Sequence, residues 1–135
     1  MRNVLNEEQA RKELADFLNE YAEKEITADD VHEIAPLVLD ALMAGNLVLD
    51  QKPRYTLLKP IKNDAGEITL SELEFKTRIL PTTYAELGKG LDIQKEIMRF
   101  NLVCVAHIIG QPYKMLDKFS RKDYEFIQQF GMLFT

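Results

Sequence analysis

The sequence predicts an α+β fold, in which a β-hairpin is covered by C-terminal helices and preceded by an N-terminal helical segment. The main observation is a change of hydrophobic period. Apolar residues recur at helical spacing before Gly45, alternate over residues 55–76, and return to helical spacing after Thr83. Turn-forming residues in the middle of the alternating stretch indicate a hairpin. With 135 residues, the chain has the length of a single domain.

Charge divides the chain into two segments. Residues 1–50 carry 4 Lys or Arg against 12 Asp or Glu, whereas residues 51–135 carry 13 against 10. We therefore distinguish an acidic helical N-terminal segment (1–50) from an α+β domain (51–135). Nucleic acid is not expected as a partner, because phosphate binding requires a clustered basic face. No apolar run approaches the roughly 20 residues that span a bilayer, and the start of the sequence has no apolar secretion signal, so a cytoplasmic location is expected.

The N-terminal segment contains signals for two helices. Asn6, followed by acidic residues, fits a side-chain cap, and an apolar stripe then runs to about residue 24: Leu14, Phe17, Leu18 and Tyr21. A second cap at Thr27–Asp30 precedes a helical pattern that ends at Gly45, which suits a left-handed C-terminal cap. Pro36 lies inside this pattern, where it either kinks the helix or starts a new one.

The strand signals lie between residues 47 and 76. A short strand is expected at LVLD (47–50), and YTLLKPI (55–61) forms the first arm of the hairpin, followed by the turn sequence NDAG (63–66). In the second arm the alternation slips by one residue. A β-bulge near Ser71 and Glu72 is therefore expected to bring four side chains onto one face: Ile68, Leu70, Leu73 and Phe75.

Helices are expected after the hairpin. Thr83 and Glu86 fit a capping box that opens a short helix ending at Gly88. Asp92 fits the cap of the next helix, which is expected to end before Gly110. The apolar stripe of this second helix contains Ile93, Ile97, Phe100, Cys104, His107 and Ile108.

The last helix has two apolar faces. Ser120 and Asp123 fit its N-terminal cap. One face carries Tyr124, Ile127 and Gly131, and the other carries Phe126, Phe130 and Leu133. Two such faces exceed what one core contact needs, so the second set is our candidate partner-binding surface. The alternative, left open at this point, is that these three side chains pack on the N-terminal helices.

No catalytic or metal-binding motif is found in the sequence. His32 and His107 have no partners at metal-ligand spacing. Cys104 and His107 share a helical face, but their apolar neighbours favour core packing over an activated thiol, and Cys104 is expected to be buried. We therefore expect a protein that is not an enzyme and that has no cofactor, metal or catalytic residue.

Residues 55–134 resemble the tail assembly chaperones of long-tailed bacteriophages, specifically those of contractile-tailed phages. The resemblance lies in an ordered set of features: the strand ending in Lys-Pro-Ile, the hairpin with Gly-Glu, the segment TTYAELGKG (82–90), and AHIIGQPYKMLDKFSRKDYEFIQQFGMLF (106–134). The N-terminal segment departs from the family pattern, since members often begin close to the Lys-Pro-Ile strand.

The resemblance implies a non-enzymatic chaperone that binds the phage tape measure protein and keeps it soluble during tail assembly in the host cytoplasm. It implies absence from the mature virion, the tail tube protein or a second copy of the chain as further partners, and no membrane. Two alternatives stay open. One is a structural tail component, which would be expected to contain more β-strand. The other is a DNA-binding regulator, which the acidic charge of the N-terminal segment disfavours.

Overall fold

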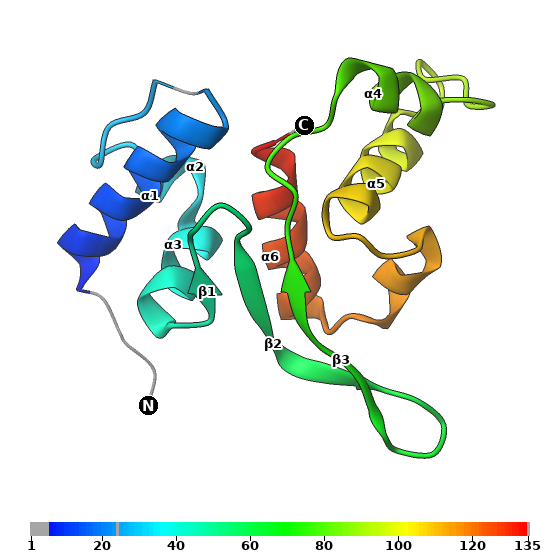
Figure 1. The fold of residues 1–135 in the computed structure, drawn as a ribbon, viewed down its shortest axis with the longest axis horizontal. Coiled ribbons are helices and arrows are strands. Elements are labelled where there is room, and N and C mark those ends of the chain that lie inside the picture. Colours follow the sequence, from blue (N-terminus) through cyan, green and yellow to red (C-terminus); the bar gives the residue numbers. More distant parts are fainter. Residues whose placement is uncertain (1–5, 24, 135) are drawn as a thin grey trace.

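The computed structural model describes residues 6–23 and 25–134 and confirms the predicted α+β fold (Figure 1). The three strands form one antiparallel sheet in the order β1-β2-β3. In chain order the elements are α1 (Glu7–Tyr21), α2 (Val31–Ile34), α3 (Pro36–Ala44), β1 (Leu47–Val48), β2 (Arg54–Lys62), β3 (Ile68–Glu74), α4 (Pro81–Leu87), α5 (Ile97–Ile108), the 3₁₀-helix η1 (Tyr113–Lys118) and α6 (Arg121–Met132).

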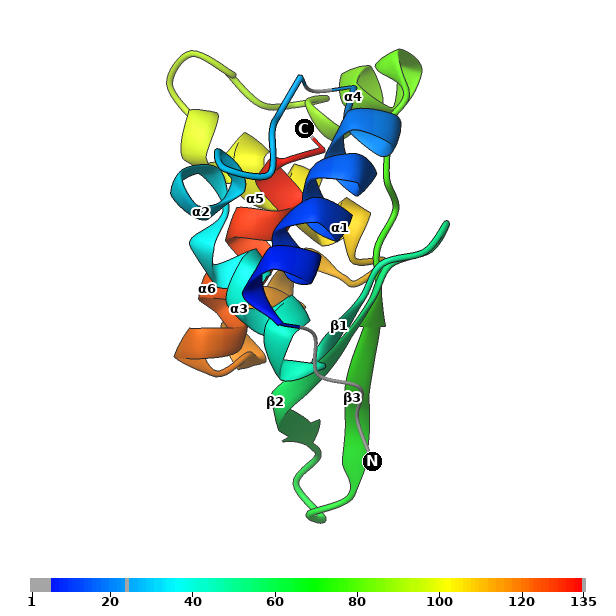
Figure 2. The same ribbon diagram turned by 90° about the vertical axis from the view of Figure 1, so that its left-hand side faces the viewer.

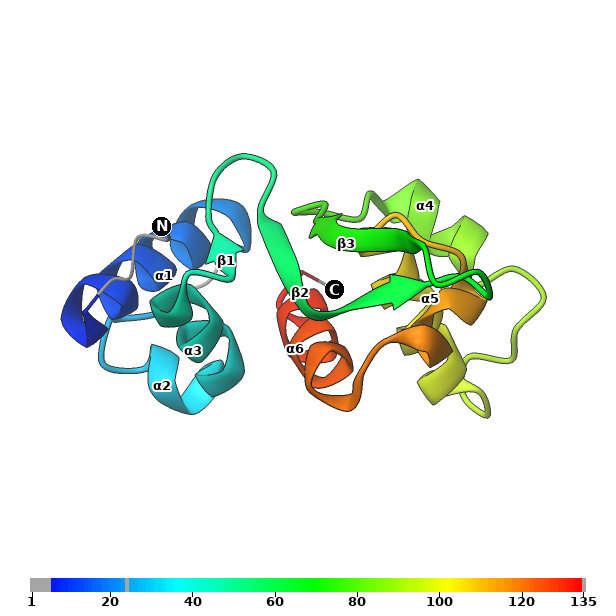
Figure 3. The same ribbon diagram turned by 90° about the horizontal axis from the view of Figure 1, so that it is seen from below.

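Helix α6 occupies the centre of the molecule. It contacts α3, β2 and α5. Seen from below, the N-terminal helices lie on one side of α6, and α5 and η1 lie on the other, while β2 runs across it and pairs with β3 (Figure 3). The buried apolar residues of all these elements form one hydrophobic cluster. The acidic N-terminal segment and the α+β domain therefore share a single core.

The helix signals of the N-terminal segment are largely confirmed. Asn6 caps α1, accepting a 2.8 Å hydrogen bond from the backbone N–H of Gln9. Helix α1 ends at Tyr21, a few residues earlier than predicted. Pro36 starts a new helix, α3, rather than kinking a continuous one. Gly45 closes α3 with a φ of 81°, the left-handed conformation that a glycine adopts without a steric penalty.

The second predicted cap forms differently. The hydroxyl of Thr27 donates to the carboxylate of Asp30 at 2.8 Å, so the two residues do pair. Helix α2, however, begins only after Asp30, and neither side chain caps its first turn.

Helix α3 receives its N-terminal cap from a distant residue. Ala35 cannot cap it, because alanine has no side-chain acceptor. Instead the side-chain oxygen of Gln129 in α6 accepts hydrogen bonds from the backbone N–H groups of Leu37 at 2.8 Å and Val38 at 3.1 Å. A helix start leaves N–H groups without a partner in the helix; Pro36 has none, and those of Leu37 and Val38 are satisfied in this way. The N-terminal segment is thereby joined to the last helix.

The predicted hairpin is present, and its turn forms as expected. The backbone N–H of Gly66 donates to the carbonyl of Asn63 at 3.0 Å, and Gly66 has a φ of 82°. The side chain of Asn63 accepts from the backbone N–H groups of Ala65 and Glu67, both at 3.0 Å. These local bonds fix the loop between β2 and β3.

The predicted position of the bulge is wrong. Thr56 pairs with Glu72, and the next pair is Ile61 with Leu70, so the extra residues of the main irregularity lie in β2 and not at residues 71–72. The four apolar side chains of the second arm also do not share one buried face, since Ile68 is 59% exposed. The hairpin tip extends beyond the helices that cover the rest of the sheet (Figure 2).

The starts of the two helices after the hairpin were also predicted wrongly. Helix α4 begins at Pro81, two residues before Thr83, because proline is already set in helical φ and needs no N–H at the first position. Helix α5 begins at Ile97 rather than after Asp92. Asp92 instead begins a turn, in which the backbone carbonyl of Asp92 accepts a hydrogen bond from the backbone N–H of Glu96 at 2.7 Å. Ile93 therefore lies outside the helix and is 44% exposed.

Candidate partner-binding site

The three residues predicted to form a partner-binding surface are part of the core. Phe126, Phe130 and Leu133 are 3%, 0% and 8% exposed, so the prediction that they are free to meet another chain is wrong. The ring of Phe130 stacks on that of Phe17 in α1 at a centroid distance of 6.4 Å. The alternative that the sequence left open, packing on the N-terminal helices, is thus found for Phe130, whereas Phe126 stacks on Tyr55 of β2.

The cap of α6 has a second role that the sequence did not reveal. As predicted, the Ser120 hydroxyl oxygen accepts from the backbone N–H of Asp123. The Asp123 carboxylate, fully buried, also accepts four hydrogen bonds, from the Tyr55 hydroxyl at 2.6 Å, the Ser120 hydroxyl at 2.9 Å, and the backbone N–H groups of Leu58 at 2.9 Å and Lys59 at 3.0 Å. A buried charge is stable only with such a full set of partners.

The Asp123 network explains the irregular register of β2. The N–H groups of Leu58 and Lys59 bond to the carboxylate of Asp123, and Pro60 has no N–H to donate. The segment between Thr56 and Ile61 therefore bulges out of the ladder with β3. The side chain of Leu58 is 57% exposed, whereas that of its neighbour Leu57, on the opposite side of the strand, is buried.

Burial and the Asp123 carboxylate act together on Tyr55. Burial raises the pKa of the Tyr55 hydroxyl far above its usual value, and the hydrogen bond to Asp123 and the negative charge of Asp123 raise it further. The phenol therefore stays protonated and keeps donating. The Tyr55 ring also stacks on that of Phe126 at a centroid distance of 3.9 Å, so both its polar and its apolar parts bind α6.

A groove between α3, β2 and α6 is the best candidate for a binding site, and we call it the α3–α6 groove. It encloses about 370 Å³. Its apolar lining consists of the Tyr55–Phe126 pair and of side chains from α3 and β2: Leu37, Ala41, Ala44 and Leu58. Leu37 is 37% exposed, so two leucines stand at the mouth of the groove in contact with solvent. The polar lining is Asp40, Asn46, Lys122 and Glu125.

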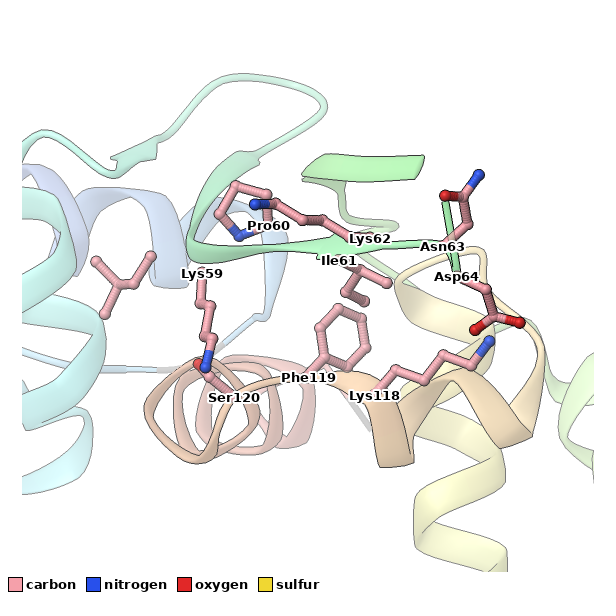
Figure 4. A pocket seen from close by; sticks show the side chains of 10 residues that line it. Lys59, Pro60, Ile61, Lys62, Asn63, Asp64, Lys118, Phe119 and Ser120 are labelled. Atoms are coloured by element: carbon pink, nitrogen blue, oxygen red, sulfur yellow. The ribbon is translucent and has the colours of Figure 1, made fainter. Parts of the chain in front are cut away.

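A second, more open cavity lies on the other side of the bulge. It measures about 820 Å³ and is lined by residues 58–64 and 118–120. Ile61 and Phe119 face each other across its centre, and Lys118 points toward Asp64 (Figure 4). Because the lining of this second cavity includes three lysines, Asn63 and Asp64, we consider the α3–α6 groove the better receptor for an apolar side chain.

Cys104 and His107 are placed as the sequence predicted. Cys104 is buried, and burial raises the pKa of its thiol, which makes it a poor nucleophile. Burial and the nearby Lys76 ammonium lower the pKa of His107. Lys76 also donates a 3.2 Å hydrogen bond to the backbone carbonyl of His107. Cys104 thus belongs to the hydrophobic core, and His107 lies beside Lys76 in the segment that follows β3.

Within residues 6–23 and 25–134, no three His, Cys, Asp or Glu side chains are arranged so that they could hold a metal ion. No described helix has the length and apolar character needed to cross a bilayer.

Comparison of the chain with protein-family models, with curated proteins and with solved structures finds no significant match.

Proposed function

We propose that the protein is a non-enzymatic phage tail assembly chaperone that binds a helical segment of the tape measure protein in the α3–α6 groove. The order of features in residues 55–134 supports the family, as set out above. The observation that carries the binding site is the groove itself, in which exposed Leu37 and Leu58 flank a buried aromatic floor. An amphipathic helix commonly binds by placing its apolar residues into such a groove.

The physical task of such a chaperone is to shield apolar surface. Long helices with an exposed apolar stripe aggregate until their partners arrive, so a small protein that covers part of the stripe keeps them soluble. In this proposal the chain acts in the host cytoplasm and leaves the tape measure protein when tail tube subunits assemble around it. It is then absent from the mature virion. The tail tube protein and a second copy of the chain are further proposed partners.

The test is co-expression with the tape measure protein encoded by the same phage or prophage. We expect the wild-type chain to keep the tape measure protein in the soluble fraction and to co-purify with it. Leu58→Glu should abolish both effects, because it places a charge at the mouth of the groove. Ile68→Glu is the matched control, since Ile68 is exposed to a similar degree (59% against 57%) but lies outside the groove.

Thermal unfolding of both variants separates loss of binding from loss of fold. A folded Leu58→Glu variant that still solubilises the tape measure protein would show that the groove is not the binding site. If the wild-type chain itself does not retain the tape measure protein, the chaperone proposal is wrong.

A further inference from the structure

The two walls of the α3–α6 groove carry opposite charges. Asp40 lies on the α3 wall and Lys122 on the α6 wall. Neither side chain forms an ion pair or a side-chain hydrogen bond with another residue in the described part of the chain. Glu125, the other charged residue of the α6 wall, is already paired with Arg121 at 3.1 Å. The groove thus presents one available negative charge on one side and one available positive charge on the other.

The groove also has a direction. Its lining residues on α3 are Leu37, Asp40, Ala41 and Ala44, which are spaced at i, i+3, i+4 and i+7 and so follow one face along the helix. On α6 the lining residues Lys122, Glu125 and Phe126 follow the same spacing. An elongated apolar slot between two helices fits a third helix lying along it.

An amphipathic helix has two flanks beside its apolar stripe, corresponding to the e and g positions of a heptad repeat. When such a helix is turned end to end with its stripe still facing the groove, the two flanks exchange walls. A helix with acidic residues on one flank and basic residues on the other can therefore satisfy both Asp40 and Lys122 in only one of its two directions.

We propose that Asp40 and Lys122 select the direction in which an amphipathic helix lies in the α3–α6 groove. The favoured partner carries basic residues on the flank that faces α3 and acidic residues on the flank that faces α6. This inference rests on the groove put forward under the proposed function, but it does not depend on which protein supplies the helix. From the usual strength of exposed ion pairs, one direction should be preferred by about fivefold to tenfold at low salt.

The experiment uses the full chain and two synthetic peptides of about three heptads each, with leucine at positions a and d. One peptide has Glu at every e and Lys at every g, and the other has these charges exchanged. Each carries a nitroxide at its N-terminus, which broadens the NMR signals of nearby amides in the isotope-labelled protein. We expect one peptide to broaden signals near Leu37 and the other to broaden signals near Ala44, at the opposite end of α3.

Reversing the charges of Asp40 and Lys122 tests whether these two residues set the orientation of the bound peptide. The double variant D40K/K122E should exchange the ends that the two peptides broaden. The matched control D16K/K114E also reverses two exposed charges, but outside the groove, and should change nothing. Circular dichroism of each variant verifies the fold before titration.

Several outcomes would overturn the inference. They are failure of either peptide to bind the folded wild-type chain, broadening of the same end by both peptides, and an orientation that D40K/K122E leaves unchanged. A concentration-dependent dimer in sedimentation that excludes the peptides from the groove would assign the surface to a second copy instead. Because the peptides are synthetic, none of these results depends on whether the tape measure protein is the natural partner.

Discussion

The hydroxyl of Tyr55 in β2 donates a 2.6 Å hydrogen bond to the carboxylate of Asp123 in α6, which lies 68 positions away in the sequence. The same carboxylate receives two backbone N–H groups of the bulge, so one side chain fixes the position of the sheet against the central helix. The position of Leu58 at the mouth of the α3–α6 groove depends on this network.

Asp123→Asn should destabilise the protein by about 3 kcal/mol or more, because the amide NH₂ would face donors where the carboxylate now accepts four hydrogen bonds. Asp117→Asn, at an exposed position of η1, is the control and should change the free energy of unfolding by less than about 0.5 kcal/mol. Urea unfolding of both variants measures the difference. Equal stabilities would mean that the network contributes little.

The raised pKa of the Tyr55 hydroxyl predicts that the protein loses stability in alkaline solution. This pKa is raised in the folded protein, chiefly by burial, so the unfolded chain releases the phenol proton first. The stabilisation is therefore complete below about pH 10 and declines above it, by about 1.4 kcal/mol per pH unit. Tyr55→Phe lacks this ionisation, so the stability difference between wild type and variant should be constant below about pH 10 and narrow between about pH 10 and 12. A constant difference would contradict the assignment.

Gln129→Ala should destabilise the protein by about 1 kcal/mol, the usual effect of losing a helix cap, since the N–H groups of Leu37 and Val38 lose their acceptor. The adjacent Gln128 is exposed, so Gln128→Ala provides a control with the same change of residue. Amide hydrogen exchange should locate the effect in the first turn of α3. If the amides of that turn exchange equally slowly in Gln129→Ala and in the wild type, water replaces the cap without loss of stability.

Replacing Phe126 and Phe130 together with serine should unfold the protein. Each is almost fully buried, and truncating a buried phenylalanine costs about 3–5 kcal/mol against a total stability of about 5–15 kcal/mol. Met98→Ser, at a side chain that is 76% exposed, should leave the melting temperature nearly unchanged. A double variant that stays folded would contradict the assignment of Phe126 and Phe130 to the core.

The thiol of Cys104 should react with a thiol-specific reagent much more slowly in the native protein than in urea, by about tenfold or more, because it is 1% exposed and burial raises its pKa. Absorbance of the released reagent group gives both rates. Comparable rates would show that α5 opens readily on the time scale of the reaction.

The sequence predicted features whose causes are local. The caps of α1 and α6, the hairpin turn and the left-handed Gly45 each depend on hydrogen bonds or φ values within a few residues. Hydrophobic period gave the α+β class and the arms of the hairpin. Where two local signals competed, as with Pro81 and Thr83 at the start of α4, the residue with the more restricted backbone determined the helix start.

The candidate site could not be predicted in the same way. The Gln129 cap joins residues 91 and 92 positions apart, and the Asp123 network reaches 64 to 68 positions back to β2. Serine and aspartate three residues apart already form a cap, so nothing in the local sequence signals a further role. The error at Phe126 and Phe130 has a related cause, because helical spacing shows which residues share a face but not how many neighbours surround the helix.

The central place of α6 has a consequence for synthesis. It is made after every other described element, yet it provides the cap of α3, the carboxylate that anchors β2 and the aromatic side chains at the centre of the core. On the ribosome, the preceding elements therefore keep much of their apolar surface exposed until α6 has been made. Folding of the described elements is therefore expected to finish only after α6 has been made, and until then the nascent chain is expected to depend on the general chaperones of the cell that makes it.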